Sequence, residues 1–544
     1  MISALLATAV LLPLLAALGT NRRWLRQTGL WLSPAVLLLL GMIGEQAETT
    51  LALEWLLLGG SLSVDAINRP LLLLAGIGWL LAGWFALDRI TQSPAVFARF
   101  WLLTLAGQAL ALLSTHMAGF YAGYVVMTLA AFGLVVHSGR AEAWRAGRVY
   151  LWLALAGEAL ILTGLLLLSG RYANAAFAEL LIRVPVDGGG APWFLLAGFA
   201  VKLGVVPLHI WLPLAHPVAP VPASAVLSGL LVKAGLLGML RFVPPGSLPD
   251  VQWLAVLGLC TAFYAAMVGL GQRRLKTVLA YSTVSQMGLL LIAYAGVHQV
   301  APDLALAAVS LFAVHHGINK ISLFLAAGSQ PGASRLRGLL FALPSLSLVG
   351  LPLLSGAFAK HLFKESLAET SWAWVAGWLG LSSMATALLL LHAWRLASHQ
   401  RRRAPLHPAW PLSVLAGLLL PLCWAWQLGV LAWPDWGKWL DGLWPAAAAF
   451  ALWMAWRRRP RRLHWRWPAL PEGDLLTPIQ GVWFAVLSRL AKLAPQVSGW
   501  SQPAWRQPSL AAAAERVERL ATRLPVAGGL LLVVLALLGW RMLG

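Results

Sequence analysis

Long apolar stretches recur along almost the whole chain, and this feature limits the fold more than any other. A helix needs about twenty apolar residues to cross a bilayer, and sixteen segments of roughly that length can be placed in the sequence. Only 11% of the 544 residues are charged, too few to cover a soluble protein of this size. The sequence therefore predicts an all-α polytopic membrane protein with about 16 transmembrane helices.

The predicted spans follow the apolar runs, and several of them contain proline or glycine. The first run is followed by arginines and has no basic segment before it, so we expect a retained helix and not a signal peptide. The spans lie near residues 2–19, 29–45, 70–88, 100–115, 119–138, 149–169, 192–213, 222–243, 251–271, 277–297, 303–328, 338–360, 371–396, 409–431, 437–456 and 524–543.

The net charge of +21 comes from short basic runs between spans, so it indicates membrane topology and no nucleic-acid partner. These runs occupy one set of loops, while Glu45, Glu48 and Glu54 lie in an intervening loop. The loop at 170–191 fits the alternation least well, and we assign it to the outside. The pattern predicts a multi-pass protein of the bacterial cell inner membrane with a periplasmic N-terminus. The basic runs are Arg22/Arg23/Arg26, Arg89/Arg99, Arg140/Arg145/Arg148, Arg273/Arg274/Lys276, Arg335/Arg337, Arg401/Arg402/Arg403 and Arg457/Arg458/Arg459/Arg461/Arg462.

Several ionisable residues lie inside predicted spans. A lysine at the bilayer centre costs on the order of 3 kcal/mol, so such residues are functional candidates. Lysine changes its protonation state readily when buried, and histidine titrates near neutral pH, so together they suit a proton relay. The alternative for Lys202 and Lys360 is that they snorkel from helix ends, and His315 has a structural alternative. The predicted relay residues are Glu158, Lys202, Lys233, His316, Lys320 and Lys360.

Two spans carry helix-breaking residues next to a predicted relay lysine. Breaks release backbone carbonyl and amide groups, and breaks at matching places in two halves mark ion sites in transporters built from inverted repeats. We therefore expect two inverted five-helix repeats, each containing a broken helix. The predicted breaking residues are Gly204, Pro207 and Pro213, with His209 among them, and Gly350, Pro352 and Gly356.

The repeats define the expected organisation of the chain. The long interruption at 457–523 contains two amphipathic pieces and is expected to lie on the membrane surface, either alone or as a brace against other subunits. The predicted regions are 1–99 (N-terminal helices), 100–245 (first repeat), 246–400 (second repeat), 401–456 (additional helices), 457–523 (surface region) and 524–544 (C-terminal helix).

We expect no cofactor and no metal in this chain. Cys260 and Cys423 stand in apolar segments without the spacing of a zinc or iron–sulfur site, and no nucleotide-binding motif is present. If electrons are involved in the function, a partner subunit handles them.

The sequence also resembles a known family over roughly residues 100 to 400. The run KLGVVPLHIWLP at 202–213 is similar to the antiporter-like subunits of respiratory complex I, of Mrp-type cation/proton antiporters and of membrane-bound hydrogenases. Further stretches carry the resemblance at 215–222, 228–233, 275–286, 316–320, 323–328 and 350–360.

The resemblance implies about fourteen core helices with two inverted repeats, plus extra C-terminal helices in the larger members. It also implies proton transfer from Lys202 through Lys233, His316 and Lys320 to Lys360. The family usually has a glutamate in the fifth span, but Val125 holds that position here, and Leu214 stands where an aspartate is common. Either Glu158 substitutes as counter-charge, or the first half has lost pumping.

The predicted function is therefore that of a proton-translocating subunit in a multisubunit complex, such as an NADH-quinone oxidoreductase-type translocase without its own redox centre. Partners are expected to be other membrane subunits, the lipid bilayer, and protons or sodium. Two alternatives stay open. One is a sodium/proton antiporter subunit, and the other is a non-conducting coupling subunit of a hydrogenase or inorganic-carbon uptake complex.

Overall fold

The structure is a computed structural model of the whole chain, and almost all of it is helical. The residues that it describes are 2–43, 50–54, 56–299, 302–368, 371–399, 405–431, 436–458 and 471–475. The predicted span at 524–543 and nearly all of the predicted surface region 457–523 lie outside the described residues.

The N-terminal part consists of long helices and one small hairpin. Proline opens α3 and α4, where its fixed φ suits the first turn and its missing N–H costs nothing. The elements are α1 (Ile2–Leu18), α2 (Arg23–Ile43), β1 (Leu51–Leu53), β2 (Gly60–Leu62), α3 (Arg69–Arg89), α4 (Pro94–Leu113), α5 (Met117–Val136), α6 (Ala141–Tyr172) and α7 (Phe177–Asp187). The two strands pair antiparallel.

The remaining elements include three predicted spans that are split into shorter pieces. They are α8 (Ala191–Leu203), α9 (Trp211–Val218), α10 (Val221–Val226), the π-helix η1 (Leu227–Leu231), α11 (Lys233–Phe242), α12 (Gln252–Leu270), α13 (Leu275–Gly296), α14 (Pro302–Ala327), the 3₁₀ turn η2 (Pro331–Ala333), α15 (Arg335–Val349), α16 (Ser355–Ala368), α17 (Ala373–Ser398), α18 (Ala409–Gln427) and α19 (Trp436–Arg458).

Within the described residues, eleven helices are long and apolar enough to cross a membrane, and α1 and α8 are shorter apolar helices. Each of the first fifteen predicted segments coincides with a helix or with a split helix. The prediction of a polytopic helical membrane protein is thus confirmed, while the total of sixteen spans stays a prediction.

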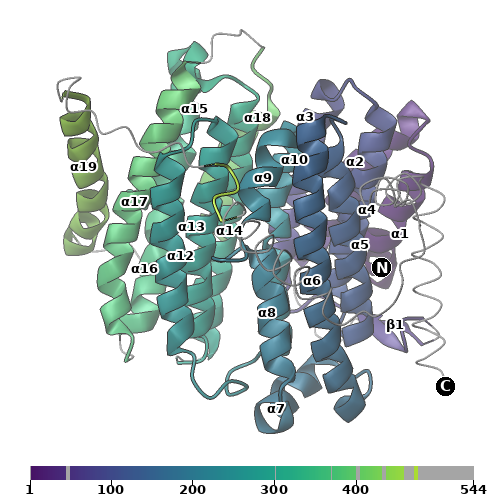
Figure 1. Cartoon of the computed structure of the whole chain (residues 1–544). Helices are drawn as coiled ribbons and strands as arrows, with labels where there is room; N and C mark the ends of the chain where they lie inside the picture. Colours follow the sequence, from purple (N-terminus) through teal and green to yellow (C-terminus); the bar gives the residue numbers. More distant parts are fainter. Residues whose placement is uncertain are drawn as a thin grey trace, which may run out of the picture. The chain divides into compact units, whose positions relative to one another are not determined.

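The connections fall at two opposite ends of the bundle (Figure 1). At one end, the 174–177 segment contacts both the hairpin and the start of α5: Asn174 donates to the Leu57 and Leu58 carbonyls, and the Phe177 N–H donates to Thr115. At the other end, His407 contacts Asp88 and Arg274 contacts Glu142. The 170–191 loop therefore lies at the end opposite these basic segments, while its assignment to the outside of the membrane stays a prediction.

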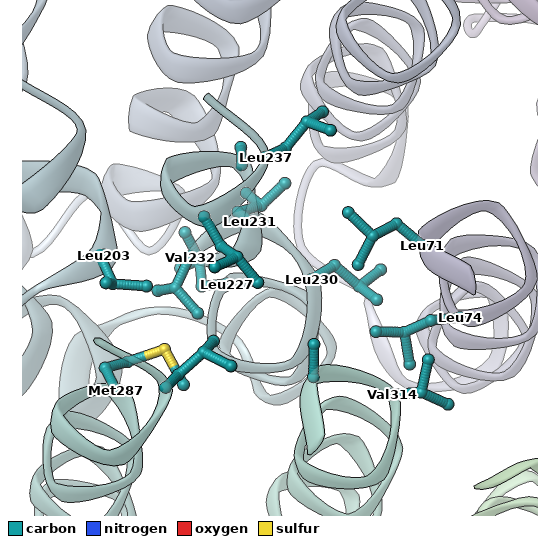
Figure 2. Packing of buried hydrophobic residues seen from close by; sticks show 14 of the residues in the cluster. Leu71, Leu74, Leu203, Leu227, Leu230, Leu231, Val232, Leu237, Met287 and Val314 are labelled. Atoms are coloured by element: carbon teal, nitrogen blue, oxygen red, sulfur yellow. The ribbon is translucent and has the colours of Figure 1, made fainter. Parts of the chain in front are cut away.

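The core of the bundle surrounds the split segment that contains η1. Figure 2 shows leucines of α3, η1 and α11 packed together with Val314 of α14 and Met287 of α13. An 18-residue stretch in each of the spans Val221–Phe242 and Leu275–Gly296 is completely buried by other helices. Polar side chains on these two spans consequently face protein and not lipid.

Close approach of α4 and α5 depends on two glycines. A Cβ on Gly123 would lie 2.4 Å from the Ala111 backbone nitrogen and 2.7 Å from the Gly107 carbonyl oxygen. Small residues at such crossings let helix backbones touch, which is how membrane helices gain packing energy.

We therefore expect Gly123→Ala to lower the free energy of unfolding by about 1–3 kcal/mol, because a backbone clash can be relieved only by separating the helices. Gly377→Ala in α17 is the matched control, since nothing lies within 4 Å of its Cβ position. It should leave stability unchanged or raise it by up to about 1 kcal/mol. Denaturation of the two purified variants in detergent measures the difference, and equal stability would contradict the crossing.

Candidate functional site

The first broken segment places Lys202 in the last turn of α8. Gly204 ends the helix with φ +77°, a left-handed conformation that glycine adopts without strain. The chain then runs irregularly to Trp211, whose indole N–H donates to the freed Val201 carbonyl at 2.9 Å. The amine of Lys202 is buried and donates to the Thr128 hydroxyl of α5 at 3.1 Å. It therefore points into the bundle and does not snorkel.

Lys202 shares a small, mostly apolar cavity with Glu158 of α6. The cavity measures about 20 Å³, enough for about one water molecule. Both carboxyl oxygens of Glu158 are buried and have no hydrogen-bond partner in the described part of the chain. The Lys202 amine also lies 5.7 Å and 5.8 Å from the ring centroids of Tyr124 and Tyr150. These rings and the carboxylate form an environment that attracts positive charge.

A π-helical turn positions Lys233. Such turns widen the helix and leave carbonyls outside the regular ladder, and they occur frequently at functional sites. The Lys233 amine donates to the Ser228 carbonyl at 2.9 Å and lies 2.8 Å from Nδ1 of His316 on α14. The other ring nitrogen of His316 is buried without a hydrogen-bond partner among the described residues. Two titratable groups from distant segments are thus in direct contact.

Lys320 lies one helical turn after His316 on α14 and is fully buried. Its amine donates to the Ser282 hydroxyl at 2.7 Å and to the Leu279 carbonyl at 3.2 Å, both on α13. His315 points elsewhere, as expected: its Nδ1 lies 3.2 Å from the Ser355 hydroxyl of α16. The residues on α14 therefore face different neighbours: His316 faces Lys233, Lys320 faces α13, and His315 faces α16 in the second broken segment.

The second broken segment holds Lys360. Gly350 ends α15 with φ +94°, which leaves the last carbonyls of that helix without helical partners. The Lys360 amine donates to the Val349 carbonyl at 2.9 Å and to the Ser383 hydroxyl of α17 at 2.7 Å. It lines a cavity of about 720 Å³, which is also bordered by His361 and Lys364. Lys360 likewise points at the break and not at a membrane surface.

A row of polar side chains on α13 and α17 lies between the contacts of Lys320 and those of Lys360. Gln286 donates to the Thr386 hydroxyl at 3.0 Å, which joins the two helices deep in the bundle. Several buried polar atoms in this row have no partner in the described residues, and a buried polar group without a partner is costly unless water or a mobile proton serves it. These atoms belong to Ser285, Gln286 and Ser382.

An apolar contact follows Lys202 toward the centre of the bundle. Leu203, Val232 and Met287 pack together next to the ends of α8 and α11 (Figure 2). No hydrogen bond among the described residues joins Lys202 to Lys233. The first lysine and the central pair are thus separate polar groups with an apolar boundary.

The predicted helix-breaking residues lie either in the two breaks or in the helices that follow them. Gly204 and Pro207 lie in the first break, and Gly350 and Pro352 in the second. Pro213 and Gly356 lie in the first turns of α9 and α16, which begin at Trp211 and Ser355. Sequence reasoning missed several polar partners, since a serine or threonine in an apolar run carries no signal of its own: Thr128, Ser228, Ser282 and Ser383.

The fold and site together define a polytopic helical membrane protein with two broken helices and a buried lysine–histidine axis. The chain belongs to the NADH:quinone oxidoreductase/Mrp antiporter transmembrane family, whose profile matches residues 114–388.

Individual relatives agree with this membership. NAD(P)H-quinone oxidoreductase chain 4 2 of Microcystis aeruginosa is 32% identical over 289 residues, covering 50% of this chain and 50% of the relative. Hydrogenase-4 component B of Escherichia coli is 29% identical over 291 residues, covering 49% and 43%. The chain thus spans half or less of the length of these two relatives. Among solved structures, a chain of the Mrp complex from Dietzia sp. DQ12-45-1b has a TM-score of 0.68 at 22% identity, covering 82% of this chain and 97% of that one.

The geometry predicts that Lys320 does not stabilise the fold. Lys320→Met keeps the side-chain volume, and the Leu279 carbonyl still accepts from Thr283. Removing a buried amine in this way should leave the free energy of unfolding unchanged or raise it by about 1–2 kcal/mol. Phe324→Ala, at a fully buried position on the same helix, should lower it by about 3–5 kcal/mol. Denaturation in detergent compares the two, and a comparable loss in Lys320→Met would mark the lysine as structural.

Proposed function

We propose that this chain carries protons across the membrane as the antiporter-like subunit of a multisubunit complex. Glu158 acts as counter-charge for the first lysine, and protons move along the buried axis at mid-membrane depth. The successive carriers are Lys202, Lys233, His316, Lys320 and Lys360.

The observation that supports this function best is the direct contact between Lys233 and His316, at 2.8 Å in a fully buried position. One proton can be held by either nitrogen, so a shift of neighbouring charge moves it between them. In the described residues none of the four lysines of the axis forms an ion pair with a carboxylate. Their charges are therefore free to respond to each other.

The remaining transfers need water. The polar row on α13 and α17 offers unpartnered atoms beside Lys320 and Lys360, and water bound there would extend the path. The boundary at Leu203 and Val232 is apolar, so passage from Lys202 requires transient hydration. Such a boundary allows a charge change on Glu158 to control when the first lysine releases its proton.

The full architecture belongs to the same proposal. We infer sixteen spans arranged around two inverted five-helix repeats, because both broken helices end in a left-handed glycine and hold a lysine at the break. The basic end of the bundle would face the cytoplasm of a bacterium, which puts the N-terminus in the periplasm. The names of the relatives describe components of an oxidoreductase, a hydrogenase and the Mrp complex, so we expect membrane subunits as partners.

The central prediction concerns Lys233. In membrane vesicles that contain the complete complex, Lys233→Ala should reduce proton flux by at least about tenfold, since it removes one side of the only direct amine–imidazole contact in the described residues. Arg183→Ala, an exposed residue at the opposite end from the basic segments, is the control and should retain flux. Flux is followed with a pH-sensitive dye and normalised to assembled complex. Unchanged flux in both Lys233→Ala and Lys320→Ala would remove the relay.

The identity of the ion is tested in the same vesicles. Replacing sodium by choline should leave the flux of the native protein unchanged if protons alone move. A flux that disappears in choline supports the sodium/proton antiporter, and an absence of flux in both salts supports the non-conducting coupling subunit.

Glu158 gives a separate prediction. Glu158→Gln keeps the size of the side chain but removes the only carboxylate that lines the cavity of Lys202. Proton flux should fall by about tenfold or more, because no charge then favours the protonated amine. Tyr121→Phe in α5 is the control and should retain flux, because Tyr121 does not line this cavity. If Glu158→Gln retains full flux, Glu158 does not take over the role of the glutamate that the family usually has at the position of Val125.

A further inference from the structure

A short acidic turn far along the sequence reaches the first broken helix. The described residues resume at Pro471 after α19, and residues 471–475 form a turn that Figure 1 shows in yellow beside α9 and α13. This turn carries Glu472 and Asp474, two of only 19 acidic residues in the chain. Neither acid was singled out by its sequence context.

Asp474 is buried against the break between α8 and α9. Its side chain is 4% exposed, and its Oδ2 atom lies 3.4 Å from Nε2 of His209, which is fully buried. The Tyr264 hydroxyl of α12 donates to the same oxygen at 2.6 Å. The other carboxyl oxygen of Asp474 and Nδ1 of His209 have no hydrogen-bond partner among the described residues. A carboxylate and an imidazole thus meet with one polar atom of each left available.

Glu472 holds the turn in place through different contacts. It accepts from the Thr277 hydroxyl at 2.9 Å and pairs with Arg274 at 3.3 Å, while its backbone carbonyl accepts from the Tyr281 hydroxyl at 3.0 Å. Thr277 and Tyr281 are on α13, and Arg274 is the residue before its first turn. Docking of the turn therefore does not need the Asp474 carboxylate. Burial of a carboxylate costs free energy, so its presence here needs another explanation.

We infer that Asp474 is the positioning carboxylate of His209, and that this pair is the proton-transfer group between the basic face of the bundle and the buried axis. The inference rests on the proposed function and adds to it a residue from beyond the matched family region, which ends at residue 388. It also gives the segment after α19 a role in transport.

The chemistry requires only a neutral imidazole and a fixed carboxylate. His209 keeps its Nε2 proton toward the Asp474 carboxylate, accepts a second proton on the unpartnered Nδ1, and later releases that proton from the same nitrogen toward the axis, which restores the neutral ring. The carboxylate stabilises the imidazolium that exists between the two steps. Burial raises the pKa of the Asp474 carboxyl, but hydrogen bonds from His209 and Tyr264 outweigh burial and hold that pKa below its usual range. The carboxylate is consequently charged at neutral pH.

Other charges around the pair come from three elements. Tyr264 belongs to α12 and Tyr281 to α13. Arg274 directly precedes α13 and is also paired with Glu142 of α6. Glu472 in the turn offsets Arg274. Among the described residues, Asp474 is the acidic residue in contact with His209. Removal of its charge should therefore make the imidazolium less stable.

The test is the pH profile of proton flux in vesicles that contain the complete complex. Asp474→Asn keeps the shape and the acceptor for Tyr264 but not the charge. We expect flux near the native level at about pH 6 and about tenfold lower at about pH 8, because the imidazolium loses its counter-charge. Asp474→Glu should restore part of the alkaline flux, and His209→Gln should lower flux at both pH values.

Glu472→Gln is the matched control, since it lies in the same turn, keeps an acceptor for Thr277 and does not contact His209. Its pH profile should remain native. An equal fractional loss at every pH in Asp474→Asn, or the same shifted profile in Glu472→Gln, would show that the turn only anchors the chain and would overturn the inference. Lys233→Ala is run in parallel: loss of its flux with a native profile in Asp474→Asn rejects this inference alone, while retained flux in both Lys233→Ala and Lys320→Ala rejects the proposed function.

Discussion

The need to hold buried amines without ion pairs governs this structure. An uncompensated charge in the membrane interior is costly, and the chain satisfies its lysines largely with neutral oxygens that irregular backbone makes available. Val349 offers its carbonyl at the end of α15, and Ser228 offers one in the π-helical turn. Helix breaks and lysines therefore occur together because each is unfavourable alone: the break frees an acceptor, and the amine occupies it.

Much of the fold could be predicted from composition and period. The length of the apolar segments predicted the helices. The alternation of arginine runs predicted which connections share an end of the bundle, and it placed the 170–191 loop at the other end. The buried lysines were also identifiable, because an amine within an apolar run has no inexpensive explanation. Their roles as carriers stay a prediction, although the contact of Lys233 with His316 gives that prediction a geometry.

Other features had no sequence signal for physical reasons. A π-helical turn differs from an α-helical turn by one hydrogen-bond register, and the run at 227–231 is apolar in either case. The contact between Asp474 and His209 joins residues 265 positions apart, so no local pattern connects them. Pro213 does not mark the end of the first break by itself, because proline is tolerated in the first turn of a helix as well as in a break.

The two broken helices differ in how open their surroundings are. Lys202 has a cavity of about 20 Å³, whereas Lys360 borders one of about 720 Å³. A cavity of the first size holds about one water molecule and the second holds many, so the second break offers much more room for water than the first. The proton path proposed for this chain needs such an inequality, since a path that is wet at both ends would leak. The apolar contact of Leu203 with Val232 and Met287 lies on the side of the smaller cavity. In the proposed path it would keep the two ends from being hydrated together.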